Sequence, residues 1–320
     1  MRLVGIALFV LILQRIEIKE IPHLLVQARP VFIPAALSTI YVILSLKTLC
    51  WIALFSRQGF RLKTFDAFKT YFYSIFLGMV TVGHAGDALR AYSLARLSEG
   101  GLNNAGGNVT FGEAGVSVIL ERFIELGLYL MCGSVGILLL EGETLQSKTF
   151  YSICILAAIY LVALYLLMVH SRGIWKRLEK ADSGKGKLAG WLLENLKGLV
   201  YGLSHFPLSG LLRPFLFTFF SWLVIALNFY IIARVIAIQL PYFYCLFIYP
   251  LVSLVQLFPV TVAGFGTREA ALLYCFSHFG VSAERTVAFS LIYFFIWLTA
   301  LVIPGLIISL FTPVKGRRAS

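Results

Sequence analysis

Charged side chains are scarce in this chain. They make up 13% of its 320 residues, whereas 59% of the residues are hydrophobic, and the mean hydropathy is +0.88. Soluble domains carry about 25% charged residues. A chain of this length therefore lacks the polar surface that a water-soluble fold needs, and we expect its excess apolar surface to face lipid.

Several motifs that would indicate other classes of protein are missing. The five cysteines contain no CxxC pair and fall within apolar runs, which argues against disulfides and zinc sites. There is no P-loop, GxSxG or acidic sugar-nucleotide motif. The net charge of +12 is not accompanied by an RNP motif, so we expect no nucleic-acid partner. We also expect no cofactor, no metal and no catalytic residue.

The positive charge instead marks the ends of apolar runs. Eight of the 27 Lys and Arg residues lie between Arg172 and Arg213, and three more lie in the tail from Lys315 to Arg318. Loops rich in Lys and Arg stay on the cytoplasmic side of a membrane. The segment 171–213 and the C-terminus are therefore expected in the cytoplasm, and the acidic loop 141–148 outside.

The apolar runs are long enough to be membrane helices. They lie at about 2–18, 31–55, 67–82, 113–140, 149–170, 213–238, 242–262 and 286–311. About 20 apolar residues span the hydrocarbon core, and a lipid-exposed backbone must be helical unless it forms a closed barrel, which no alternating pattern supports. Residues 14–17 do not resemble a cleavage site for a signal peptide, so the first run is expected to remain as a helix.

Glycines interrupt two of these runs. The run 67–82 is followed by Gly83 and Gly86 and a second helical stretch at 87–97. The run 242–262 is followed by Gly264 and Gly266 and another helical stretch at 268–279. If all eight runs crossed the membrane, the C-terminal tail and the basic loop after the run 31–55 would lie outside. All basic loops lie in the cytoplasm if each broken pair enters and leaves the membrane on the same side. We therefore predict an all-α polytopic membrane protein with about six full spans and two re-entrant pairs, arranged as an inverted repeat.

We expect the whole chain to form a single transmembrane domain. Its first half is 1–170, its second half is 213–320, and a connector occupies 171–212. Leu192, Leu196, Leu199 and Leu203 recur at helical spacing within the connector. An interfacial helix explains this stripe better than a helix that binds a partner.

Three clusters place charges within or beside the apolar runs, where a charge costs about 2.5–3.5 kcal/mol. The first is Asp87 with Arg90, one helical turn apart after the first glycine break. Its amino-terminal amides and Arg90 could hold a phosphate. An ion pair that merely closes a turn is the alternative.

The second cluster is Glu121, Arg122 and Glu125, well inside the run 113–140. These charges must find partners inside the bundle, either for structure alone or to line a substrate path. Lys47, in the middle of its own run, could pair with one of these carboxylates or extend to the interface.

The third cluster is Arg268 and Glu269, which follow the second glycine break. Thr267 is expected to cap the helix, which leaves Arg268 beside exposed amides as a second anion site. The adjacent Glu269 allows the pair to neutralise itself when no ligand is bound.

Together these residues are similar to a known family. Gly83–Arg90, Glu121–Glu125 and Pro259–Glu269 resemble, in order and spacing, the three motifs of the lysylphosphatidylglycerol synthase transmembrane family. Two of its first-motif residues are replaced by Val82 and His84, and a third-motif glycine by Val260. The large members carry an additional aminoacyl-transferase domain, which we do not expect in this chain.

The resemblance implies the lipid-handling half of that activity. We expect a flippase-like protein in the inner membrane, with both termini cytoplasmic, that moves a lipid with an anionic headgroup. Two alternatives stay open: an intramembrane transferase acting on a lipid-phosphate carrier, and an accessory subunit that presents lipid to a partner enzyme. Besides this lipid, the partner of the chain could be a second copy of itself or a lipid-modifying enzyme.

Overall fold

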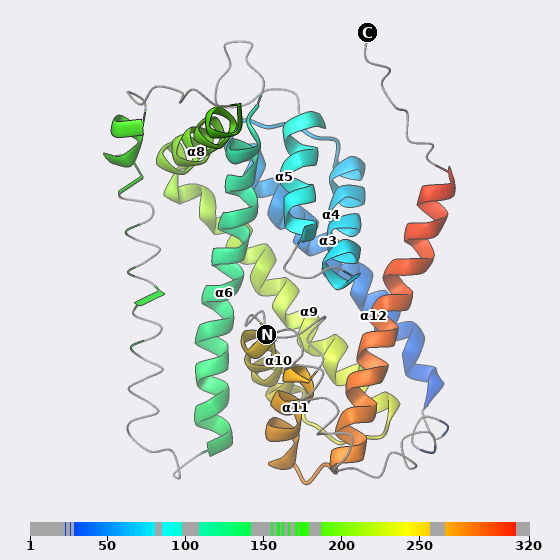
Figure 1. The fold of residues 1–320 in the computed structure, drawn as a ribbon. Coiled ribbons are helices and arrows are strands. Elements are labelled where there is room, and N and C mark those ends of the chain that lie inside the picture. Colours follow the sequence, from blue (N-terminus) through cyan, green and yellow to red (C-terminus); the bar gives the residue numbers. More distant parts are fainter. Residues whose placement is uncertain are drawn as a thin grey trace.

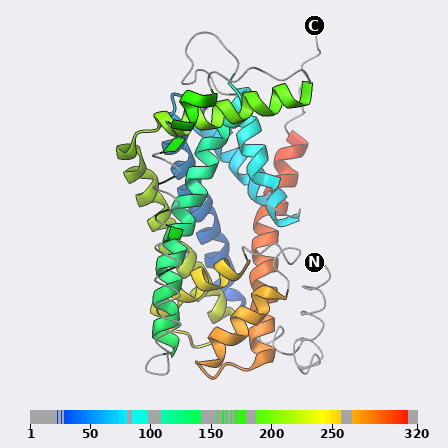
Figure 2. The ribbon, with the colours of Figure 1, turned by 60° about the vertical axis from the view of Figure 1, so that its left-hand side comes forward.

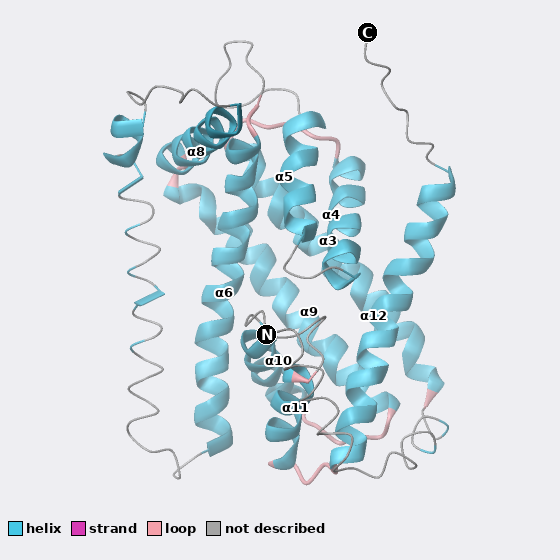
Figure 3. Cartoon of the chain, in the orientation of Figure 1, coloured by secondary structure: helices cyan, strands magenta, loops and turns pink. Residues whose placement is uncertain are grey.

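The computed structural model describes residues 29–80, 85–97, 109–141, 173–178, 187–256 and 266–311, together with single residues between 23 and 26 and between 155 and 171. Within these residues the secondary structure consists of helices joined by short loops (Figure 3). The predicted all-α class is confirmed. The expected runs 2–18 and 149–170 lie largely outside the described residues.

Among the described residues, four helices are long and apolar enough to cross a membrane. Their membrane-length segments are Pro30–Arg57, Phe111–Leu140, Ser209–Val235 and Ala283–Pro304. They belong to α3 (Ile33–Arg57), α6 (Phe111–Glu141), α9 (Leu212–Val235) and α12 (Ala283–Phe311), which run along the length of the molecule (Figure 1). These helices are apolar on nearly every face, as expected for helices surrounded by protein and lipid.

The two predicted helix pairs are both present. α4 (Thr64–Val80) is followed by α5 (Ala85–Leu97), and α10 (Tyr242–Gln256) by α11 (Thr267–Ser277). α4 and α5 lie side by side in the upper half of the molecule, and α10 and α11 in the lower half (Figure 1). Gly83 and Gly264, the predicted centres of the breaks, lie outside the described residues.

The connector contributes α8 (Lys187–His205), followed by a short 3-10 helix, Leu208–Leu211. α8 crosses the upper end of the molecule at a steep angle to the long helices (Figure 2). Leu203 is buried and Leu199 packs beside it, whereas Leu192 and Leu196 are exposed. One part of the apolar stripe therefore packs inside the protein and the other part is exposed on its surface. The interfacial role of α8 stays a prediction.

Close backbone contacts through glycine attach α8 to the start of α6. A Cβ on Gly198 would lie 2.0 Å from Thr110 Oγ1, and one on Gly112 would lie 1.7 Å from the Asn195 carbonyl oxygen. The Asn195 side chain also accepts a hydrogen bond from the Gly112 amide at 2.9 Å. Only glycine permits this approach, so these residues fix α8 against α6.

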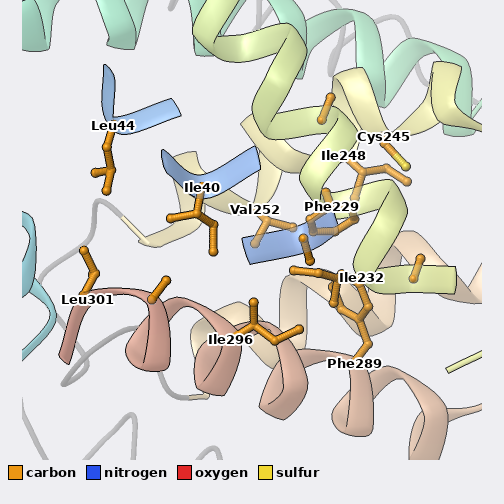
Figure 4. Packing of buried hydrophobic residues seen from close by; sticks show 14 of the residues in the cluster. Ile40, Leu44, Phe229, Ile232, Cys245, Ile248, Val252, Phe289, Ile296 and Leu301 are labelled. Carbon is orange, nitrogen blue, oxygen red and sulfur yellow. The ribbon is translucent and has the colours of Figure 1, made fainter. Parts of the chain in front are cut away.

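The main apolar core joins the two halves. Ile40 and Leu44 of α3 pack with Phe229 and Ile232 of α9, and further contacts come from α10 and α12 (Figure 4). Asn228 of α9 crosses this core, donating to the Ala36 carbonyl oxygen and to Thr39 Oγ1 at 2.9 Å each. Trp297 of α12 donates to Asn228 Oδ1 at 3.2 Å, so one buried amide ties three helices together.

Candidate functional site

The first charged cluster lies in the opening turns of α5. The helix begins at Ala85, two residues earlier than expected, so Gly86 belongs to its first turn. A Cβ on Gly86 would lie 1.8 Å from the Ser74 carbonyl oxygen, so glycine here permits α5 to approach α4. Asp87 Oδ1 accepts a hydrogen bond from Arg90 Nη2 at 2.6 Å, which forms the expected i, i+3 pair.

Arg90 is fully buried and links this cluster to α6. Its side chain is 0% exposed and forms an ion pair with Glu121. Tyr71 of α4 donates to the same carboxylate at 2.6 Å, and the Arg90 guanidinium lies 4.6 Å from the centre of the Tyr71 ring. Two helices, α4 and α5, therefore satisfy the charge of Glu121 on α6, and the prediction that these charges find partners inside the bundle is confirmed.

Arg122 connects the same cluster to Glu125. Its Nε and Nη2 donate to Asp87 at 2.8 and 2.9 Å, and its Nη1 donates to Glu125 at 2.9 Å. Lys47 of α3 forms an ion pair with Glu125, which confirms the pairing considered from the sequence. Tyr129 donates to Glu125 at 2.9 Å.

The first and second clusters are thus one network. It contains three cations and three carboxylates: Lys47, Arg90, Arg122, Asp87, Glu121 and Glu125. The network is formally neutral as a whole, which lowers the cost of burying it in an apolar bundle. The side chains of the network differ in exposure: that of Arg122 is 37% exposed, whereas that of Arg90 is 0% exposed.

The third cluster lies at the start of α11. Gly266 has a φ of 90°, a backbone conformation that glycine adopts readily, and it precedes the first helical residue, Thr267. The Gly266 amide donates to Glu269 Oε2 at 2.6 Å. The predicted cap was Thr267, but the side chain that caps the helix is Glu269, because Thr267 already lies within the first turn.

Arg268 is held by its neighbour and by α12. Its Nη2 donates to Glu269 Oε1 at 2.9 Å, and its Nε donates to Ser290 Oγ at 2.7 Å. The expected self-neutralising pair is therefore present. Asp87 and Glu269 occupy corresponding places, because each is the third residue of the helix that follows a break.

A cavity of about 450 Å³, the central cavity, is lined by residues from both halves of the site. Asp87, Arg122 and Glu125 line it from the first half, and Arg268 lines it from the second half. Much of the remaining wall is aromatic: Tyr129, Phe229, Tyr249, Phe289 and Tyr293. Arg90, Glu121 and Glu269 do not line this cavity, but Arg90 bonds Asp87 and Glu269 bonds Arg268, which do line it.

A second cavity of about 220 Å³ also borders the ion-pair network. Asp87, Arg122, Glu125 and Tyr249 line both cavities. Lys47 and Ser74 line only the smaller one. Sequence reasoning missed Ser74, Tyr71 and Ser290, because neutral hydroxyl residues in apolar runs give no local signal of their long-range partners.

The charged network and central cavity lie at the three motifs that resembled a known family. A family model described as the lysylphosphatidylglycerol synthase TM region matches residues 2–305. The chain belongs to this family. A comparison with curated proteins found no significant match.

Membership of the lysylphosphatidylglycerol synthase transmembrane family assigns the chain to the membrane proteins associated with lipid handling. The matched region contains the α4–α5 and α10–α11 pairs and both cavities. Among the described residues, no group of three or more His, Cys, Asp and Glu side chains could hold a metal ion.

Proposed function

We propose that the chain is a lipid translocase that moves a phosphate-bearing lipid between the two leaflets. The observation that supports this most directly is the central cavity, which presents Arg122 from one half of the chain and Arg268 from the other. An anionic headgroup could pass between these guanidinium groups inside the protein while its hydrocarbon tails remain in lipid.

Arg122 has the capacity to bind a phosphate without losing its present partners. Three of its five N–H groups are engaged by Asp87 and Glu125. Guanidinium groups bind phosphate oxygens through paired, charge-assisted hydrogen bonds. In this proposal Arg122 and Arg268 contact the headgroup, and Arg90, Glu121 and Glu269 position the charged residues around it.

We further propose that the two halves form an inverted repeat. α3, the α4–α5 pair and α6 correspond to α9, the α10–α11 pair and α12. The two pairs occupy opposite ends of the molecule (Figure 1), and α3 and α9 run in opposite directions. In transporters with inverted repeats, discontinuous helices form the substrate site between the halves.

The orientation follows from the basic connector. We place the end that α8 covers in the cytoplasm and the end where α11 meets α12 outside the inner membrane. The described residues at the covered end include Arg57, Arg61 and Lys197. Because the sequence has no ATP-binding motif, lipid would move down its gradient or be coupled to an ion.

The test is leaflet exchange in proteoliposomes. Fluorescent phosphatidylglycerol is compared with phosphatidylcholine, whose headgroup has no net charge. We expect faster exchange of the anionic lipid, and a loss of about tenfold or more in Arg122→Ala and in Arg268→Ala, since a charged hydrogen bond is removed. Arg234→Ala is the matched control, because Arg234 bonds Tyr230 and lines neither cavity.

Unchanged exchange in Arg268→Ala would rule out the proposed path. If the wild type exchanges neither lipid, turnover of a labelled lipid-phosphate donor by the purified protein would favour the transferase alternative. Activity that appears only with a co-purified enzyme would favour the accessory role.

A further inference from the structure

A proline in the interior of α10 interrupts the hydrogen bonds of that helix. Pro250 has no amide hydrogen, so the carbonyl oxygen four residues earlier, at Leu246, loses its helical partner, and helices commonly bend at such a position. The indole N–H of Trp222 in α9 donates to this oxygen at 2.8 Å. A side chain from a neighbouring helix thus replaces the missing backbone bond, as a helix in lipid requires.

The other interior proline of the described helices is paired in the same way. Pro304 lies within α12, and the carbonyl oxygen four residues earlier, at Ala300, accepts a hydrogen bond from Tyr41 of α3 at 3.0 Å. Pro304 and Tyr41 line neither cavity, whereas Tyr249, the residue before Pro250, lines both. A bend at Pro250 therefore acts directly on a wall of the candidate site.

Tyr249 lies where the two cavities adjoin. Asp87, Arg122 and Glu125 line both cavities from the first half of the chain. Among the described residues of the second half, Tyr249 alone lines both. Its ring packs edge-on against that of Tyr129, with ring centres 5.8 Å apart, and Tyr129 donates to Glu125 at 2.9 Å. The position of Tyr249 is therefore linked to the ion-pair network through one side chain.

α6 presents glycine to α10 on both sides of the proline. A Cβ on Gly136 would lie 3.1 Å from the Cβ of Phe247, and a Cβ on Gly133 would lie 2.9 Å from Cδ1 of Leu254. Because glycine has no side chain, α6 inserts nothing between the two parts of α10 at these positions. The hydrogen bond from Trp222 therefore carries much of the restraint on the angle between them.

We propose that Pro250 and Trp222 are positioning residues of the candidate site. In this proposal α10 bends at Pro250, and the hydrogen bond from Trp222 to the Leu246 carbonyl oxygen holds the bend in its present form. When that bond breaks, Tyr249 moves away from the ion-pair network and the two cavities join. The use of this movement in transport rests on the proposed function, whereas the movement itself can be measured without lipid exchange.

The test is the accessibility of the smaller cavity, which Ser74 lines. Ser74→Cys is introduced into the full chain without its native cysteines, and its reaction with a small, water-soluble thiosulfonate is followed in detergent. Trp222→Phe removes the donor but keeps a ring, and should speed the reaction about fivefold, the effect of one hydrogen bond. Pro250→Ala gives the Leu246 carbonyl oxygen an amide partner, and should slow the reaction below the wild-type rate. In the Pro250→Ala background, Trp222→Phe should then change little.

Two controls separate this hinge from a general loosening of the fold. Tyr41→Phe also removes the donor to a carbonyl oxygen freed by a proline, but at Pro304, away from both cavities. It should leave the reaction of Ser74→Cys at the wild-type rate. Ser209→Cys, at an exposed position after α8, should react at the same rate in every background.

Equal rates at Ser74→Cys with and without Trp222→Phe and Pro250→Ala would overturn the proposal. An equal effect of Trp222→Phe in both proline backgrounds would also overturn it, because the indole would then not replace the bond that Pro250 removes. Acceleration by Tyr41→Phe, or at Ser209→Cys, would show general loosening instead of a hinge in α10.

Leaflet exchange of phosphatidylglycerol is measured separately in proteoliposomes. We expect Pro250→Ala to slow it about fivefold or more, since the cavities would join less often. The predicted labelling without exchange in the wild type would refute the translocase and retain the hinge. The predicted labelling with wild-type exchange in Pro250→Ala would overturn the role of the hinge in transport.

Discussion

At the scale of single residues, two glycines near the first break differ sharply in their surroundings. A Cβ on Gly86 would lie 1.8 Å from the Ser74 carbonyl oxygen, whereas one on Gly78 would meet none of the described residues within 4 Å. We predict that Gly86→Ala destabilises the protein by about 1–3 kcal/mol through overpacking. Gly78→Ala should leave stability unchanged or slightly raised. Thermal unfolding in detergent measures both, and equal midpoints would contradict the close approach of α5 to α4.

The Arg90–Glu121 pair gives a second prediction at this scale. Arg90→Met leaves Glu121 buried without its cation and should cost about 3–5 kcal/mol. Adding Glu121→Gln to that variant should recover part of the loss, because the uncompensated charge is removed. The measurement is the free energy of unfolding of each single variant and of the double variant. Additive losses would show that the two side chains do not interact.

The sequence could predict that these charges are paired, but it could identify only some of the partners. Asp87 with Arg90 and Arg268 with Glu269 are close in sequence, and helical spacing alone suggests each pair. Arg122 and Tyr129 bond Glu125 from the same helix, but Lys47, Tyr71 and Arg90 reach Glu125 or Glu121 from α3, α4 and α5, far away in the sequence. Such contacts depend on how the helices pack, which no local pattern contains.

At the scale of elements, the attachment of α8 to α6 is testable through its glycines. Gly198→Ala would place a methyl group 2.0 Å from Thr110 Oγ1, whereas none of the described residues lies within 4 Å of the corresponding position of Gly190 on the same helix. We predict faster hydrogen exchange at the start of α6 in Gly198→Ala and unchanged exchange in Gly190→Ala. Equal exchange in both variants would show that α8 is not held by this contact.

The existence of both helix pairs could be predicted from the sequence, but the residues at which the helices begin could not be predicted as well. Glycine clusters between apolar runs are a strong local signal, and the structure describes a separate helix before and after each break. The start of α5 and the cap of α11 differ from the predictions by one or two residues. Their positions depend on tertiary contacts, namely the approach of Gly86 to Ser74 and the Glu269 carboxylate at the Gly266 amide.

At the scale of the whole molecule, the proposed topology predicts which ends are accessible from each side. Ser209 follows α8, and Ser277 ends α11 at the opposite end of the molecule; both are exposed. In a cysteine-free background, an impermeant thiol reagent applied to the outside of cells should label Ser277→Cys. It should label Ser209→Cys only after the membrane is opened. Labelling of both from outside would contradict the orientation.

The two halves of the molecule meet at the central cavity, so a headgroup that crosses the protein there would contact Arg122 and Arg268 one after the other. If one headgroup passes Arg122 and Arg268 in turn, the slower step limits exchange. The double variant Arg122→Ala/Arg268→Ala should then be about as slow as the slower single variant. If the two residues served separate paths, losing both should be far more damaging than losing either one.

The most direct measurement is therefore the initial rate of phosphatidylglycerol exchange in proteoliposomes for the wild type, the two single variants and the double variant. We predict a loss of about tenfold or more in each single variant and little further loss in the double variant. Wild-type rates in either single variant would contradict this prediction, because the cavity would then not be the route of the headgroup.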